Sequence, residues 1–254
     1  MSKISDVNPT FAIIWFIVST IIYGFFKYFI ALIDINDINN STTKNFNDYI
    51  NSNNNNNNIK TNLDMLLYGF LFFVIISEFF INLSLTRVLC DKTPQYYTAT
   101  YSTIIPWVLI FTTLIALLRL FPGWLSPFSN TFGYGIAIIM GIKDLFNNLI
   151  RKDFKGLDEN SRKALTHITN DRSILINEIS MENIDDFWNN MSSIFNVSQY
   201  TTQNKLQLFN IIRAKTIIAE VIWFILTGLL IISISYNNII NSNCEKKLEN
   251  MKNV

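Results

Sequence analysis

Residues 121–134 read FPGWLSPFSNTFGY, and this segment lies between two apolar runs, 103–120 and 133–142. Proline fixes φ and glycine permits φ > 0, so a segment with two of each has few conformations open to it. Trp124 and Tyr134 carry amphipathic rings of the kind that gather at membrane–water interfaces. The sequence therefore predicts a rigid, aromatic loop at a membrane surface.

The composition and the length of the apolar runs both favour a membrane protein. Hydrophobic residues make up 50% of the chain and charged residues 15%, against about 25% charged residues in soluble domains. At about 1.5 Å per residue, four runs can cross a hydrocarbon core of about 30 Å. They are residues 10–33, 63–89, 103–120 and 211–236. The alternative is a soluble protein with four buried helices, which a chain of 254 residues is too short to cover.

A fifth segment, 133–150, is ambiguous because Lys143 and Asp144 follow directly on its short apolar stretch. Such stretches are often re-entrant or interfacial. The stretch 143–215 holds ten Lys and Arg and the segment 121–134 holds none, which favours opposite sides of the bilayer. We therefore expect an all-α, polytopic helical membrane protein with about five transmembrane helices, or four if 133–150 is re-entrant. The N-terminus and the basic segment would be cytoplasmic, and the first span would act as an uncleaved anchor.

This interpretation divides the chain into six parts. We expect the N-terminus and first transmembrane helix (1–33), an Asn-rich disordered loop (34–62), central transmembrane helices with the aromatic loop (63–150), a polar helical extramembrane segment (151–210), the last transmembrane helix (211–236) and a polar C-terminal tail (237–254). The loop includes six consecutive asparagines, 53–58, whose side chains cannot form a core.

The extramembrane segment shows a loose helical period of apolar residues over 161–179 and again from 180 to 194. Two amphipathic helices in about 60 residues give a marginal core, so their apolar faces would pack on the membrane interface or on a partner. Phe187 and Trp188 are the candidate contact point, and a core within the chain itself is the alternative.

Residues typical of catalysis are scarce. His167 is the single histidine, and Cys90 and Cys244 are the only cysteines. In a five-span topology the two cysteines lie on opposite sides of the membrane, so we expect neither a disulfide nor a metal site. Phosphate-binding glycine loops, zinc spacings and nucleophile elbows are missing from the sequence. We expect no enzyme activity, no cofactor and no metal.

Three charged residues, Lys27, Glu78 and Glu220, lie within the apolar runs. Ionisable groups in a membrane are costly and suggest a relay or permeation path. The alternative is that they pair with one another, or that Lys27 extends to the interface, and only orient the helices. If the three charges form a relay or permeation path, the chain would be a small transporter or channel.

Pro106-Trp107, then an apolar stretch, then FPGW at 121–124 and PFSNTFGY at 127–134, with Cys90 and Gln95 upstream, resemble a membrane protein family of the nucleocytoplasmic large DNA viruses. The resemblance covers residues 90–134. It implies a minor capsid protein in the inner membrane beneath an icosahedral capsid, inserted into host endomembranes during assembly. The partners implied are the lipid bilayer, capsid or other minor capsid proteins, and further copies of the chain. The resemblance supplies no catalytic residues.

A capsid needs a link to the bilayer that it encloses, and a rigid aromatic loop suits such a contact because little entropy is lost on binding. The alternative is a hairpin turn docked on its own helices. The interaction loop that we predict consists of Phe121, Pro122, Gly123, Trp124, Pro127, Phe128, Asn130, Phe132 and Tyr134. A third hypothesis is a factor that remodels membranes through the helices near Trp188. Acidic residues are interspersed with the basic ones, so no specific nucleic acid is expected.

Overall fold

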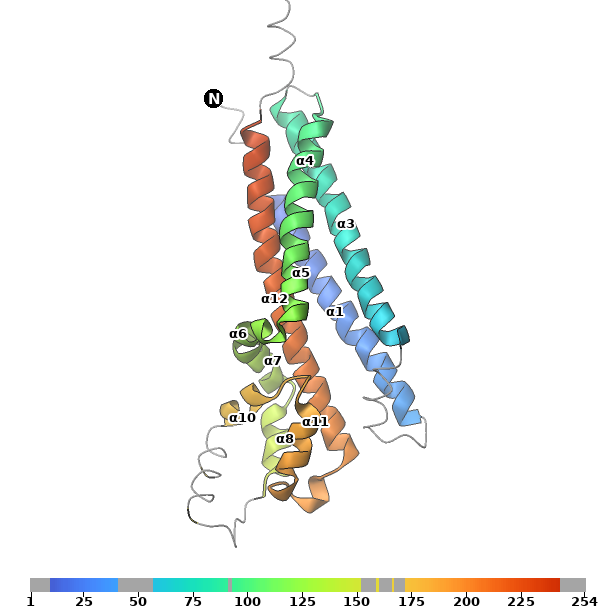
Figure 1. The fold of residues 1–254 in the computed structure, drawn as a ribbon, viewed down its shortest axis with the longest axis vertical. Helices are drawn as coiled ribbons and strands as arrows, with labels where there is room; N and C mark the ends of the chain where they lie inside the picture. Colours follow the sequence, from blue (N-terminus) through green and yellow to red (C-terminus); the bar gives the residue numbers. More distant parts are fainter. Residues whose placement is uncertain are drawn as a thin grey trace, which may run out of the picture. The chain divides into compact units, whose positions relative to one another are not determined.

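The computed structural model describes residues 10–40, 57–90, 93–151, 159, 166 and 172–242. These residues are mostly helical, and no β-strand occurs among them (Figure 1). Four of the described helical segments are long and apolar enough to cross a membrane: Thr10–Ile30, Thr61–Leu89, Tyr96–Leu120 and Thr202–Ile240. The expectation of an all-α integral membrane protein is confirmed.

The helices carry the labels of Figure 1. In chain order they are α1 (Thr10–Asn40), α3 (Asn57–Leu89), α4 (Tyr96–Pro106), α5 (Thr112–Leu120), α6 (Ser126–Phe128), α7 (Tyr134–Ile139), α8 (Ile142–Leu149), α10 (Arg172–Glu178), α11 (Ile184–Asn190) and α12 (Thr202–Ile240). The chain forms two compact units. Unit 1 comprises Met1–Phe25, Asn62–Trp124 and Val221–Val254, and unit 2 comprises Phe26–Thr61 and Leu125–Glu220.

Unit 1 contains a bundle of four helical segments, taken from α1, α3, α4 with α5, and α12, around an aromatic core. The rings of Phe16 and Trp107 lie 5.4 Å apart, and those of Phe111 and Phe224 lie 4.9 Å apart. Gly228 of α12 faces Phe16 so closely that a Cβ there would lie 2.0 Å from the ring. Because helices without a side chain at the contact can approach closely, this glycine sets the spacing of α1 and α12.

The third long helix is irregular at its middle. Pro106 ends α4, a π-helix follows over Trp107–Phe111, and α5 continues from there. Proline has no N–H, so the carbonyl of Ser102, four residues earlier, loses its usual helical donor. The hydroxyl of Ser235 on α12 donates to that carbonyl over 2.7 Å. A serine of one helix therefore supplies the hydrogen bond that a proline removes from another.

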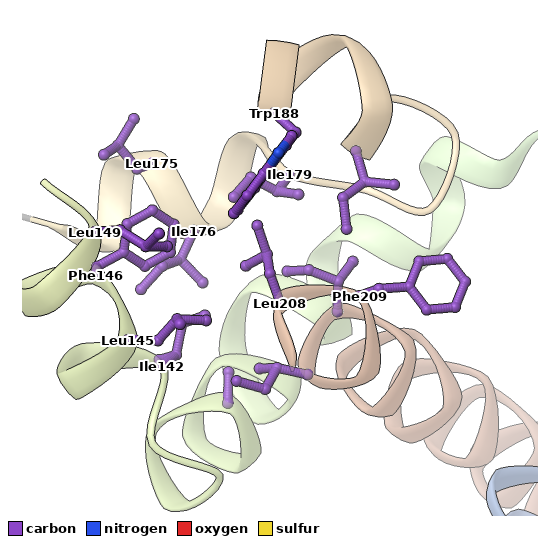
Figure 2. Packing of buried hydrophobic residues seen from close by; sticks show 14 of the residues in the cluster. Ile142, Leu145, Phe146, Leu149, Leu175, Ile176, Ile179, Trp188, Leu208 and Phe209 are labelled. Atoms are coloured by element: carbon purple, nitrogen blue, oxygen red, sulfur yellow. The ribbon is translucent and has the colours of Figure 1, made fainter. Parts of the chain in front are cut away.

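Unit 2 has a hydrophobic core of its own. Buried side chains from α8, α10 and α12 converge in it (Figure 2). On α8 they recur at Ile142, Leu145, Phe146 and Leu149, whereas the residues between them are exposed. This is the i, i+3, i+4, i+7 spacing of an amphipathic helix with one buried face.

The expected fifth span, 133–150, is not a membrane-crossing helix. Its residues form two short helices, α7 and α8, which are separated at Gly141. Gly141 has φ 86°, a conformation that costs glycine little and other residues much. The bend allows Ala137 of α7 and the buried face of α8 to join one core. Ala137 and the buried face of α8 are thus covered by protein, and four spans remain.

Helix α12 contributes to both units. Its residues 202–220 belong to unit 2 and its residues from Val221 onward belong to unit 1. At about 1.5 Å per residue, 221–240 spans about 30 Å, the thickness of a hydrocarbon core. The residues before Val221 include Lys205, Arg213 and Lys215 and contribute buried side chains to the core of unit 2. The polar segment expected at 151–210 therefore shares its core with α7, α8 and the first half of α12.

Candidate functional site

The aromatic segment 121–134 is helical, which corrects the expectation of a loop. Helix α5 ends at Leu120, and a 3₁₀ turn (Pro122–Leu125), α6 and a π-helix (Ser129–Gly133) lead into α7. Proline is well tolerated in the first turn of a helix because the N–H that it lacks would have no helical partner there. Both prolines occupy early positions of these short turns, so the residues that made the segment look like a loop are compatible with a helix.

The first part of the segment is fastened to α12 within unit 1. The indole N–H of Trp223 donates to the backbone carbonyl of Trp124 over 2.8 Å. The two indole rings stack with centroids 6.3 Å apart. Trp124 remains 47% exposed, and Phe121 is also exposed. This arrangement fits an aromatic anchor at the end of the third span, where one edge of the ring is wet and the rest is apolar.

The second part, in unit 2, has a buried side and an exposed side. Ser129 and Gly133 are buried, whereas Phe132 is 61% exposed. Phe128 lies with its ring 6.3 Å from that of Phe132. The hydroxyl of Thr131 donates to the carbonyl of Pro127 over 2.7 Å and so ties the turn to itself. Phe132 is thus exposed on a turn whose backbone is stabilised by a hydrogen bond within the turn itself.

Gly133 packs directly against α12. A Cβ at Gly133 would lie 2.6 Å from the backbone oxygen of Lys215 and 2.8 Å from its Cγ. Lys215 is itself buried, and its ammonium donates to the carbonyl of Ile176 over 2.7 Å. That carbonyl belongs to the last turn of α10, where helical carbonyls lack backbone partners. Lys215 therefore joins α10 to α12 beneath the aromatic turn.

A row of buried polar side chains runs along α3 in unit 1. Glu78, Asn82 and Thr86 recur every four residues, on one face of the helix, and all three are buried. Asn82 donates to the hydroxyl of Thr103 over 2.8 Å, and Thr86 accepts from the backbone N–H of Gln95 over 3.2 Å. Glu78 is 1% exposed, and its Oε1 has no hydrogen-bond partner among the described residues. Of the three, only Glu78 was singled out from the sequence, although the spacing of four residues was visible there.

The other two intramembrane charges bond to each other within unit 2. Lys27 of α1 forms an ion pair with Glu220 of α12. Lys27 lies near the end of the apolar part of α1, and Glu220 directly precedes the apolar part of α12. Each residue therefore lies at one end of the apolar part of its helix. Their ion pair fits a role in orienting α1 and α12. Glu78 belongs to the other unit.

Trp188 lies in the core of unit 2 rather than at an exposed contact. It is 3% exposed and packs on Phe195 and Tyr200, with ring centroids 5.1 and 5.2 Å away, and Phe187 is half-buried beside the same cluster. Figure 2 shows Trp188 directed toward this core. The predicted helices 161–179 and 180–194 correspond to α10 and α11, which are shorter. Most of 152–171, including the first part of the predicted helix 161–179, falls outside the described residues.

Cys90 is disulfide-bonded, which contradicts the expectation of no disulfide. That expectation depended on the fifth span, and Cys244 lies outside the described residues. His167 also lies outside them. Within the described part of the chain, no group of three or more His, Cys, Asp or Glu side chains is placed to hold a metal ion.

No protein-family model, characterised protein or solved structure matches the chain. Its function is therefore inferred from its residues and their geometry.

Proposed function

We propose that the chain is a structural protein of a large DNA virus particle, an integral protein of the inner membrane that links the lipid bilayer to the capsid shell. The resemblance of residues 90–134 to a viral membrane family motivates this proposal. Four apolar helices provide the membrane anchor that such a link requires. In the host cell the protein would enter an endomembrane before the particle forms.

The observation that carries the proposal is the exposed ring of Phe132 on a helical turn of unit 2. A buried glycine on the inner side of the turn and the Thr131–Pro127 hydrogen bond hold its backbone in place. Exposed aromatic side chains on such a scaffold are typical of interface hot spots, because they bury a large area and lose little conformational entropy on binding. Phe132 would contact a capsid or minor capsid protein, and Trp124 would anchor the neighbouring turn at the bilayer.

Unit 2 is suited to present this turn because α12 is shared with the membrane bundle. The first half of α12 contributes to the core of unit 2, and its second half contributes to unit 1. A partner that binds unit 2 would therefore bind a unit whose core contains residues of α12, the same helix that continues into the membrane bundle.

Site-specific photo-crosslinking on purified particles tests the proposal. A photoreactive amino acid replaces Ser126, which is exposed in the aromatic turn, and a second preparation carries it at Asn148, which is exposed on α8 of the same unit. We expect Ser126 to cross-link to capsid or minor capsid proteins and Asn148 to do so much less. Absence of the protein from particles, or links from Ser126 only to lipid and to the chain itself, would refute the structural role.

A matched pair of variants separates the contact from the fold. Phe132→Ala and Ile139→Ala each remove an exposed apolar side chain from unit 2. Neither should change the thermal stability much, because little is buried at either site. We expect Phe132→Ala to reduce incorporation into particles and Ile139→Ala to leave it unchanged.

A further inference from the structure

Glu78 is a carboxylate enclosed in an apolar helix bundle. It lies within the second apolar helix, is 1% exposed, and leaves one oxygen without a hydrogen-bond partner among the described residues. Removing an ionised carboxylate from water is costly unless an opposite charge or several hydrogen bonds accompany it. A group that persists in such a place needs a neutralising partner.

The described part of unit 1 does not provide one. Its other charged residues are Asp64, Arg87 and Arg119. Asp64 lies 14 residues before Glu78 on α3, about 21 Å along the axis, and is paired with Arg119. Arg87 is exposed and lies nine residues beyond, about 14 Å away along the axis. Residues 10–25 of α1 and residues 221–242, most of them in α12, contain no charged residue.

Tyr23 is the titratable side chain that these charge-free stretches place in the core, and its ring stacks on Phe70 at 4.6 Å. Tyr236, on the last part of α12, is half-buried. A phenol is neutral near pH 7 and cannot balance a carboxylate. The counter-charge of Glu78 therefore has to come from outside the described bundle.

Polar side chains of α3 and α4 lie about one helical turn along the bundle from Glu78. Asn82 lies one turn further along the same face, and its amide bonds Thr103 of α4. Helices α3 and α4 follow each other through a short connection and run antiparallel (Figure 1). Because Asn82 is opposite Thr103, Glu78 lies level with the turn that follows Thr103, which contains Pro106 and Trp107.

That turn is the irregular part of the third span. The π-helix over Trp107–Phe111 changes the pairing of backbone carbonyls, and π-helical turns are frequent at functional sites. The indole N–H of Trp107 is also buried without a partner among the described residues. Two unpaired polar groups thus occupy one level of the bundle. Native proteins tolerate few such groups, and each calls for an explanation such as a missing ion or water.

We propose that Glu78 is the ligand of a monovalent cation site inside the membrane bundle, occupied by a proton or by Na⁺ or K⁺. One carboxylate balances a single positive charge, whereas Ca²⁺ and Mg²⁺ sites use more carboxylates or several waters. Intramembrane carboxylates commonly mark proton or ion sites. The inference is independent of the capsid link, and it does not involve Lys27 or Glu220, which neutralise each other.

Carbodiimide labelling of the full chain in detergent micelles tests the site. Dicyclohexylcarbodiimide is an apolar reagent that modifies protonated carboxyl groups in apolar surroundings, and peptide mass spectrometry locates the product. The reaction is followed over a range of pH in choline chloride, NaCl and KCl. Glu178, an exposed carboxylate on α10, serves as the internal control in the same digest and should stay unlabelled.

We expect Glu78 to be labelled, with the labelling lost as the pH rises. Slower labelling in NaCl or KCl than in choline chloride would identify a metal cation as an occupant. Labelling that depends on pH alone would identify the proton. Either result supports the site and distinguishes its ligand.

A second measurement covers the case in which the reagent does not reach Glu78. Glu78→Gln keeps the shape and removes the charge, so it should fold and imitate the occupied state. The wild-type unfolding temperature should depend on pH or on Na⁺ and K⁺, and that of Glu78→Gln should lose this dependence. Asp64→Asn, on the same helix but half-buried and outside the core, is the control and should retain it. If Glu78 is not labelled and the wild type and Glu78→Gln respond identically to pH and salt, the proposal is wrong.

Discussion

Replacing Gly133 by alanine tests how closely the aromatic turn packs on α12. A Cβ at this position would lie 2.6 Å from the backbone oxygen of Lys215, and a backbone atom cannot move aside as a flexible side chain can. Overpacking of this kind typically costs about 1–3 kcal/mol, and a backbone obstacle places the cost near the upper end, at about 3 kcal/mol. Alanine recovers about 1 kcal/mol of helix propensity relative to glycine. The net expectation is a destabilisation of about 2 kcal/mol.

Gly135 provides the matched control two residues away. It is exposed at the start of α7, and nothing lies within 4 Å of a Cβ built there. Gly135→Ala should therefore show the propensity gain alone, a stabilisation of up to about 1 kcal/mol. The two variants have the same chemistry and opposite expected signs.

The assay is thermal unfolding of the full chain in detergent micelles, followed by tryptophan fluorescence and circular dichroism. For a chain of this size each kcal/mol shifts the unfolding temperature by about 2–4 °C, so Gly133→Ala should unfold about 4–8 °C below the wild type. Gly135→Ala should unfold at or slightly above it. If Gly133→Ala is as stable as Gly135→Ala, the turn does not pack against α12 as described.

Three further predictions concern single contacts. Ser235→Ala leaves the buried carbonyl of Ser102 without a donor and should lower the free energy of unfolding by about 1–3 kcal/mol. Ser233→Ala, at an exposed position on the same helix, should change it little, and equal shifts of the unfolding temperature would contradict the hydrogen bond. Cys90 should resist maleimide alkylation in the unfolded, unreduced chain and react after reduction, and modification without reductant would disprove the disulfide. Phe146→Ala opens a cavity in the core of unit 2 and should cost about 3–5 kcal/mol, and an unchanged unfolding temperature would show that α8 is not part of that core.

The membrane-spanning part of the fold follows from run length, and the remainder depends on details that run length does not contain. The prediction of a span at 133–150 failed because it was decided by the charge of the flanking loops, although the apolar stretch itself is short. A narrower pattern was present in the sequence: Ile142, Leu145, Phe146 and Leu149 have amphipathic spacing, and Gly141 directly precedes them. Such a pattern indicates a helix with one buried face, whereas a lipid-exposed helix is apolar all round. Giving this period priority over the charge of the loops would have predicted four spans.

The contacts of the buried polar residues could not be predicted in the same way. Lys215 and Glu220 both interrupt the start of the last apolar run, and nothing in the sequence distinguishes their roles. In the structure Lys215 caps a carbonyl of α10, and Glu220 pairs with Lys27, which is 193 residues away in the chain. Both partners come from elements that are brought together only by the tertiary fold. The isolation of Glu78 could not be predicted either, because the sequence also allowed Lys27, in another apolar run, to pair with it.

We predict the orientation of the protein from two independent features once four spans are assigned. Disulfides form and persist on the oxidising side of cellular membranes, which places the connection after Cys90 on the non-cytoplasmic side. One span, Tyr96–Leu120, separates that connection from the stretch 143–215 with its ten Lys and Arg. This stretch would then lie on the opposite, cytoplasmic side, which its Lys and Arg also favour. Four spans would also place the N-terminus across the membrane from the basic stretch, whereas the expected five spans placed both on one side. The exposed Phe132 belongs to the same connection as the basic stretch, and the partner that we propose for it would therefore be met on the cytoplasmic face of the membrane.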